Sequence, residues 1–305
     1  MSSRVESFEQ NMIPAASWRE RVSANPYFQL CKPRIVGMVI VVTALGFLLA
    51  GGNPISLFGT LVWTVIGTVM TGAGSSVLNQ YIERDSDALM KRTSSRPLPQ
   101  GSISPDMALY FGIFLCLGGV SVLVTMVNLL TGFLALLTAF LYVLVYTPLK
   151  KVTWMNTLVG AIPGALPPVG GWTAVTGAID AGAIVLFLIL FIWQLPHFYA
   201  IAWMYKDDYA KGGFQMLPVV DPTNKRTFFQ MIFFCHVLIL VSLLPAWLGL
   251  TGTAYIVAAV IAGGYFLVKG LEFVGNANRL NARAVVVASL IYLPTLLAAA
   301  MVDGN

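Results

Sequence analysis

Three oxygen-bearing side chains recur at intervals of four along one polar stretch of the sequence. Asn79, Glu83 and Asp87 follow directly on a long apolar segment that ends near Leu78. On a helix these residues form a ladder along one face, drifting by only ~40° per step. Their oxygens suit Mg²⁺, which one or two carboxylates usually hold together with the phosphates of a substrate. The spacing therefore predicts that the ladder, Asn79, Glu83 and Asp87, binds magnesium.

A basic cluster follows the ladder. Lys91, Arg92 and Arg96 come next in the chain, and Lys150 and Lys151 stand in a later loop. Because arginine can bind phosphate oxygens in a bidentate manner, a cation site beside these residues forms a receptor for a diphosphate. The competing interpretation is a solvated loop between membrane spans. An amide and two carboxylates in register beside three cations favour the binding site.

A second polar cluster comprises Asp207, Asp208 and Lys211. Neighbours on a helix point about 100° apart, so we expect one aspartate to face the ladder and bind metal, while the other is solvated or structural. The two clusters stand four predicted spans apart, which places them on the same side of the membrane. They are therefore predicted to meet at one cavity and to share one substrate.

Two ring side chains are further candidates. Tyr146 shares a helix face with Tyr142, and its ring can face a developing carbocation or belong to an interfacial tyrosine belt. His197 lies in an apolar setting, where a histidine is a hydrogen-bonded core residue, a contact to the acceptor substrate, a proton carrier or an iron ligand. His236, which has no acidic neighbours, is interpreted as structural.

Membrane helices have to position these residues. The chain has 305 residues, of which 57% are hydrophobic and 10% charged, and its mean hydropathy is +0.79, outside the range of soluble domains. About nine segments are long and apolar enough to span a membrane, and they are centred near residues 44, 67, 116, 138, 164, 192, 238, 261 and 292. We expect an all-α polytopic protein with a cytoplasmic tail (1–34) and a transmembrane domain (35–302).

Glycine and proline shape two of the predicted spans. The fifth carries Pro163, Pro167 and Pro168 beside several glycines, so we expect it to be kinked or broken and to line a cavity. The second is rich in small residues between Gly67 and Ser76. These suit close helix contact or leave room for a ligand beside the ladder.

Basic residues are confined to one side of this topology. All 18 Lys and Arg fall before the first span or in alternate loops. Because positive residues stay in the cytoplasm, we expect the N-terminus and the site inside and the C-terminus outside. The N-terminal residues lack the features of signal and transit peptides, which favours a bacterial inner membrane and a periplasmic C-terminus. The net charge of +5 indicates topology and an anionic substrate, with no nucleic acid as partner.

The polar motifs resemble the UbiA prenyltransferase superfamily. The resemblance rests on NQYIERDSDALMKRTSSRPLPQG at 79–101, YTPLKK at 146–151 and HFYAIAWMYKDDYAKGGFQMLP at 197–218, and it covers nearly the whole membrane part. It implies nine helices around a central cavity, with two acidic motifs that bind Mg²⁺ and an isoprenyl diphosphate. The haem branch of the superfamily, which these motifs match best, implies transfer from farnesyl diphosphate to a vinyl group of haem B, with haem A synthase or oxidase assembly factors as partners.

The resemblance also assigns residues. Asn79, Glu83 and Asp87 match the first motif, and Asp208, with Asp207 beside it, matches the second. Glu83 stands where much of the superfamily has aspartate, and Met204 interrupts the acidic spacing often found in the second motif; both features fit the haem branch. Two alternatives stay open at this point: a related enzyme that acts on a quinone precursor or a chlorophyllide, and a transporter in which the same acids bind an ion.

Overall fold

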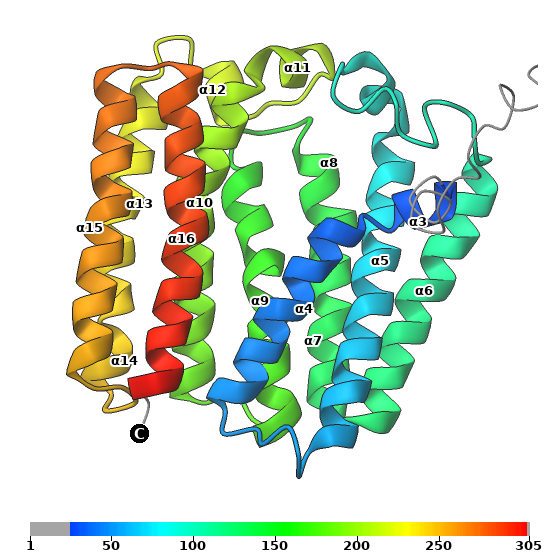
Figure 1. Cartoon of the computed structure of the whole chain (residues 1–305). Helices are drawn as coiled ribbons and strands as arrows, with labels where there is room; N and C mark the ends of the chain where they lie inside the picture. Colours follow the sequence, from blue (N-terminus) through cyan, green and yellow to red (C-terminus); the bar gives the residue numbers. More distant parts are fainter. Residues whose placement is uncertain (1–24, 304–305) are drawn as a thin grey trace, which may run out of the picture.

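A computed structural model describes residues 25–303 of the chain. Within this range the regular elements are all helices, arranged as an upright bundle (Figure 1). In chain order they are α3 (Pro26–Leu30), α4 (Pro33–Leu49), α5 (Phe58–Leu89), α6 (Pro105–Met126), α7 (Leu129–Phe140), the π-helix η1 (Leu141–Tyr146), α8 (Thr147–Leu149), α9 (Asn156–Thr176), α10 (Ala181–Met204), α11 (Lys206–Lys211), α12 (Leu217–Val220), α13 (Lys225–Ser242), α14 (Leu244–Trp247), α15 (Thr253–Gly275) and α16 (Arg279–Asp303).

Eight helical segments are long and apolar enough to cross a membrane. They are α5, α6, the run from α7 to α8, α9, α10, the run from α13 to α14, α15 and α16. A ninth apolar helix, α4, has 17 residues. The prediction of an all-α membrane protein with about nine spans is therefore confirmed.

Polar caps start several of these helices. Ser104 accepts a hydrogen bond from the backbone N–H of Met107 at the start of α6, and Asn128 accepts one from Thr131 at the start of α7. Asp180 caps α10 in the same way. Such caps satisfy N–H groups that a helix start leaves without partners, so these three spans begin at a defined residue outside the apolar run.

The fifth span, α9, is a continuous helix in spite of its three internal prolines, so the alternative of a broken segment is wrong. Close packing holds it from two sides. A Cβ atom on Gly171 would lie 1.9 Å from the carbonyl oxygen of Thr43 in α4, and one on Gly164 would lie 2.0 Å from Oε1 of Gln194 in α10. Neighbouring helices can stabilise a helix at the hydrogen bonds that prolines remove.

Small residues of α5 bring it against α6. A Cβ atom on Gly74 would lie 2.5 Å from the backbone nitrogen of Cys116, and one on Gly67 would lie 2.4 Å from Cγ of Leu123. Of the two readings of these small residues, close helix contact is the one found at Gly67 and Gly74.

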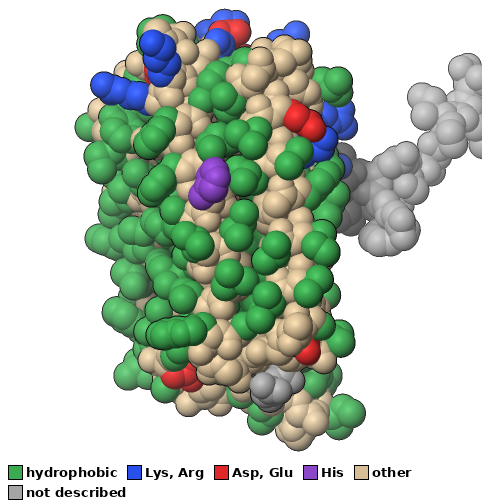
Figure 2. Space-filling model, turned by 90° about the vertical axis from the view of Figure 1, so that its left-hand side faces the viewer, with side chains coloured by type: hydrophobic (Ala, Val, Ile, Leu, Met, Phe, Trp, Pro, Cys, Tyr) green, Lys and Arg blue, Asp and Glu red, His purple; other side chains and the backbone are tan. Residues whose placement is uncertain are grey.

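Charge separates the two ends of the bundle. Within residues 25–303, every Lys and Arg lies in or beside the loops at the end that carries α11 and α12. The loops at the other end, 50–57, 127–128, 177–180 and 248–252, contain neither residue type. Figure 2 shows this separation on one face, with blue side chains gathered near one end and a mostly hydrophobic surface below. The polar clusters therefore open at the basic end.

Candidate active site

Helix α5 carries the ladder at its basic end. Asn79, Glu83 and Asp87 are 1%, 5% and 1% exposed, and they belong to its last three turns. Buried charges persist when they are paired or coordinated. Each rung of the ladder must therefore have a partner from elsewhere in the chain.

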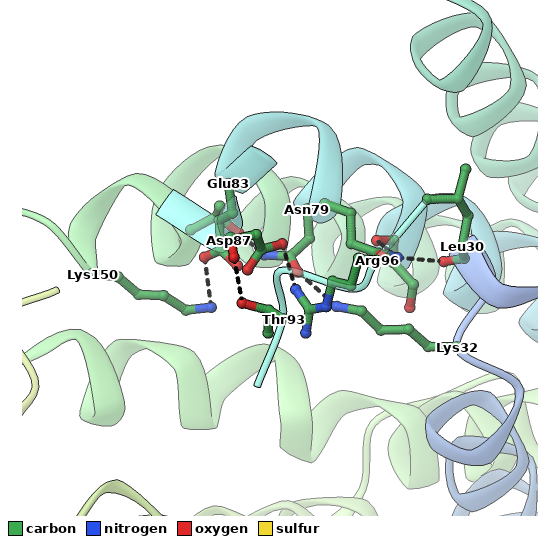
Figure 3. A network of polar contacts seen from close by, with 11 residues as sticks. Leu30, Lys32, Asn79, Glu83, Asp87, Thr93, Arg96 and Lys150 are labelled. Atoms are coloured by element: carbon green, nitrogen blue, oxygen red, sulfur yellow. Dashed lines mark hydrogen bonds and ion pairs between the residues drawn. The ribbon is translucent and has the colours of Figure 1, made fainter. Parts of the chain in front are cut away.

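Three cations from separate segments pair with the three rungs (Figure 3). Lys32 Nζ donates to Asn79 Oδ1 at 2.8 Å. Lys150 Nζ lies 2.7 Å from Glu83 Oε1, and Arg96 Nη1 lies 2.5 Å from Asp87 Oδ2. These cations come from the α3–α4 corner, the end of α8 and the loop after α5. The structure thus joins an acidic row to a basic row in one network.

Lys32 stands at a sharp corner between α3 and α4. Its backbone φ of +47° is in the left-handed region, which non-glycine residues rarely adopt. The corner is fastened to α5, because Gln80 Nε2 donates to the carbonyl oxygen of Leu30 at 2.7 Å and Leu30 is fully buried. Burial lowers the pKa of the Lys32 amine to about 7, and the nearby Arg96 guanidinium acts in the same direction.

Lys150 is positioned by the π-helix η1 and the short helix α8. Thr147 Oγ1 donates to the carbonyl oxygen of Tyr142 at 2.8 Å and accepts from Asn79 Nδ2 at 3.0 Å. Lys150 Nζ also lies 4.5 Å from the centroid of the Tyr146 ring. Single-turn π-helices are frequent at functional sites. This one places a ring, a hydroxyl and an amine around the first two rungs.

The ring of Tyr146 lies beside that of Tyr142, with centroids 5.6 Å apart. A Cβ atom on Gly160 of α9 would lie 2.5 Å from the Tyr146 ring. Glycine at position 160 therefore makes room for the Tyr146 ring. The sequence predicted that the two tyrosines share a face, but not that Gly160 packs against one of them.

The loop after α5 folds back over Asp87. Thr93 Oγ1 donates to the Asp87 carbonyl oxygen at 2.9 Å, and Arg96 reaches the carboxylate of the same residue. The other carboxylate oxygen, Asp87 Oδ1, is buried and has no hydrogen-bond partner among the described residues. A buried carboxylate oxygen left without a donor is an available ligand for a cation.

The second cluster lies against this loop. Asp208 Oδ2 accepts from the backbone N–H of Arg92 at 3.2 Å, and the Arg92 guanidinium stands over the rings of Tyr205 and Tyr209 at 5.4 and 5.6 Å. The segment after α11 continues the connection, since the backbone N–H of Gln215 donates to the Lys150 carbonyl oxygen at 2.6 Å. The two clusters therefore meet at the same end of the bundle.

The remaining candidates lie at the rim or apart from the network. The exposed side chains among the predicted site residues at this end are those of Lys91, Arg92, Lys151, Asp207 and Lys211. His197 lies between α10 and α16, where its Nδ1 is 2.6 Å from Ser289 Oγ. The structure brings together Asn79, Glu83, Asp87, Arg96, Lys150 and Tyr146, and it connects Asp208 to them through the loop.

A cavity of about 440 Å³ opens beside the network. Lys32, Arg34, Gln80 and Arg96 supply polar groups to its lining, and Phe28 and Ile35 supply apolar ones. A second cavity, of about 540 Å³, lies at the opposite end and has no charged residue in its lining. Of these two cavities among the described residues, the one beside the ladder combines cations with apolar surface.

The donor set fits a magnesium ion. Glu83 and Asp87 offer two carboxylates, Asn79 an amide oxygen, and Asp87 Oδ1 is free of other partners within the described residues. Mg²⁺ needs only one or two carboxylates when water and substrate phosphates complete its shell. Within residues 25–303, no group of three His, Cys, Asp or Glu side chains is arranged to hold a metal ion.

Sequence reasoning did not select Lys32 or Thr147. Lys32 comes from 47 residues before Asn79, and helical spacing relates only residues of one helix. Lys32-Pro33-Arg34 at the start of an apolar span was the available signal, but it is equally typical of a membrane anchor.

Comparison with known proteins places the chain in a family. Residues 39–299 match the UbiA prenyltransferase family, and the chain belongs to this family and is a prenyltransferase. A structure described as a UbiA homolog from Archaeoglobus fulgidus bound to DMAPP and Mg²⁺ has a TM-score of 0.67 at 17% identity, over 90% of this chain and 99% of that one. This likeness concerns the fold.

Relatives that are closer in sequence share one name. A protein of Salinibacter ruber is 47% identical over 91% of this chain and 98% of its own length, and one of Solibacter usitatus is 42% identical over the same shares. Both are called protoheme IX farnesyltransferase.

Proposed function

We propose that the chain transfers the farnesyl group of farnesyl diphosphate to a vinyl group of haem B, which yields haem O and diphosphate. The name of its relatives supports the donor and the acceptor. The observation that carries the reaction type is the buried network of two carboxylates and three cations at one end of the membrane bundle. Such a network matches a diphosphate that must leave as an anion.

Asn79, Glu83 and Asp87 would hold Mg²⁺ on the first motif, with Asp208 on the second and Asp207 at the rim. The bound ion supplies Lewis-acid stabilisation of the diphosphate leaving group. The magnesium and isoprenyl diphosphate in the structure of the Archaeoglobus homolog support this assignment. The unpartnered Asp87 Oδ1 supports it independently.

The paired cations have a second role once the diphosphate binds. Without substrate, Lys150 and Arg96 pair with the two carboxylates of the ladder, and Lys32 donates to the amide oxygen of Asn79. With substrate, their N–H groups turn to the diphosphate oxygens, so the charge of the leaving group is balanced by groups already in place. Lys91, Arg92, Lys151 and Lys211 add positive charge at the rim.

Bond breaking between C1 of the farnesyl group and the diphosphate oxygen leaves an allylic cation. The face of the Tyr146 ring, which already lies beside the Lys150 amine, stabilises positive charge through its quadrupole. The vinyl π electrons of haem B form the new C–C bond. Water then adds to the cation next to the porphyrin ring and loses a proton, which gives the hydroxyl group. The apolar helices exclude water from the first cation.

The basic end of the bundle faces the cytoplasm of a bacterial cell in this proposal, and the C-terminus lies in the periplasm. The distribution of Lys and Arg supports this orientation. Haem O leaves into the lipid bilayer, where haem A synthase or an oxidase assembly factor is the expected recipient.

A single reaction tests the proposal. Purified protein is incubated with haem B, farnesyl diphosphate and Mg²⁺, and the haem is analysed by HPLC and mass spectrometry. A farnesylated haem carrying one added water is expected. Transfer to a quinone precursor or a chlorophyllide, but not to haem, would identify a different acceptor. If no diphosphate is released with haem B, the proposed reaction is refuted.

A further inference from the structure

The chain has two histidines, and His197 is held in a defined orientation between α10 and α16. Its ring stacks on that of Trp193, with centroids 5.3 Å apart and planes 21° apart. Trp193 is itself fixed, because its Nε1–H donates to the Ser289 carbonyl oxygen at 2.8 Å. The rings of His197 and Trp193 are therefore both held by Ser289 of α16.

The hydrogen bonds of Ser289 determine which ring nitrogen of His197 carries the proton. Ser289 Oγ lies 2.6 Å from the Val286 carbonyl oxygen, which can only accept, so the hydroxyl proton goes there. His197 Nδ1 is 2.6 Å from the same Oγ and must then be the donor. The neutral ring consequently has its lone pair on Nε2.

That lone pair is available. Within residues 25–303, Nε2 of His197 has no hydrogen-bond partner and is not among the buried unpartnered atoms, and the side chain is only partly buried. A histidine whose Nδ1–H is held by a second residue and whose Nε2 is free has the form in which histidine binds metals. A core histidine would instead have both nitrogens satisfied.

His197 and the ladder both lie near the basic ends of their helices. It stands seven residues before the end of α10, ~10 Å along the helix, and Glu83 stands six residues before the end of α5, ~9 Å. Both helix ends lie at the end of the bundle that carries α11 (Figure 1), and α9 packs against both helices. A flat tetrapyrrole bound at His197 would therefore lie in the same half of the bundle as the leaving diphosphate.

We propose that His197 Nε2 binds the iron of the acceptor haem and that Ser289 is the positioning residue that fixes its ring. The inference rests on haem B being the acceptor. It explains how a planar apolar substrate is held at one depth and angle, since apolar contacts alone leave a ring free to rotate and slide. One iron–nitrogen bond fixes the metal centre and leaves the vinyl edge free to react.

Binding of the haem iron by His197 can be measured without farnesyl transfer. Purified wild-type protein in nanodiscs is titrated with haem B, and resonance Raman spectra of the ferrous complex should show an iron–histidine stretch. His197→Gln should lose this band and weaken haem binding at least 10-fold. Ser289→Ala should keep a ligand but weaken haem binding about 10-fold, as loss of a residue that orients a metal ligand does. His236→Gln is the matched control, because His236 is exposed on α13, and it should behave as wild type.

Two further measurements guard against misfolding and against failure of the proposed reaction. Imidazole added to His197→Gly should restore the band, and metal-free protoporphyrin should bind wild type and variants alike. An identical iron–histidine band in wild type and His197→Gln, or none in wild type, overturns the inference. A His197-dependent band without farnesyl transfer would instead overturn the proposed function and leave the ligand in place.

Discussion

Asp87→Asn separates the chemistry of the ladder from its structural role. The change keeps the shape of the side chain but removes its charge and one of two anionic oxygens, including the pair with Arg96 at 2.5 Å. Electrostatic and metal-assisted stabilisation of a leaving group is typically worth several kcal/mol. We therefore expect haem O formation to fall at least 100-fold, about 2.7 kcal/mol in activation free energy.

Folding should be affected much less. The Arg96 side chain is 23% exposed, so water can solvate the guanidinium that Asp87→Asn leaves unpaired. The loss should therefore be about 1 kcal/mol, below the ~3–5 kcal/mol expected when a fully buried pair is broken. Thermal unfolding in detergent would measure this, and initial rates at saturating haem B and farnesyl diphosphate would measure turnover.

Asp85→Asn is the control for Asp87→Asn on the same helix. The Asp85 side chain is 84% exposed and pairs only at 3.8 Å with Arg84, so turnover should stay within twofold of wild type. Retention of more than a fifth of the activity by Asp87→Asn, or an equal loss in both variants, would refute the assignment of the ladder.

Two further variants test the counterions and the packing. Lys150→Met removes the 2.7 Å partner of Glu83. It should raise KM for farnesyl diphosphate about 10-fold, which corresponds to the loss of one charge-assisted hydrogen bond. The control Lys151→Met changes an exposed side chain and should alter KM less than twofold, so equal KM values for the two variants would contradict the assignment. Gly171→Ala places a methyl group 1.9 Å from the α4 backbone and should destabilise the fold by about 1–3 kcal/mol. In the control Gly170→Ala the methyl group enters open space and should not destabilise the fold. Equal unfolding temperatures for the two variants would count against the close packing of α4 on α9.

Hydropathy alone predicts the helices well, because a membrane span must satisfy its own backbone hydrogen bonds and therefore appears as an apolar run. It also predicts α9, but the prolines and glycines of that span favour a break that the structure does not have. The helix is continuous because Gly171 and Gly164 let α4 and α10 pack directly against it. That support comes from distant segments, which the local sequence does not describe.

The site residues likewise divide into those that the sequence predicts and those that only the fold brings to the site. The spacing of Asn79, Glu83 and Asp87 predicts one helix face, and the structure has all three buried together. Arg96 and Lys150 were expected near a diphosphate because of their charge. Lys32 was not, since only the fold brings a residue from before the first span to Asn79. The π-helix that orients Tyr146 is likewise set by tertiary packing.

The corner at Lys32 has a consequence for the surrounding lipid. Asn79, to which it donates, stands ten residues before the end of α5, ~15 Å along the helix. Helix α4, which starts there, spans only ~25 Å with its 17 residues, less than the ~30 Å hydrocarbon layer. Because a helix shorter than the hydrocarbon layer is accommodated by local thinning of the bilayer, we expect the membrane to be thinner beside α3 and α4. An amphiphile with an anionic head, diffusing sideways in the leaflet, would meet the positive corner before it met the acids.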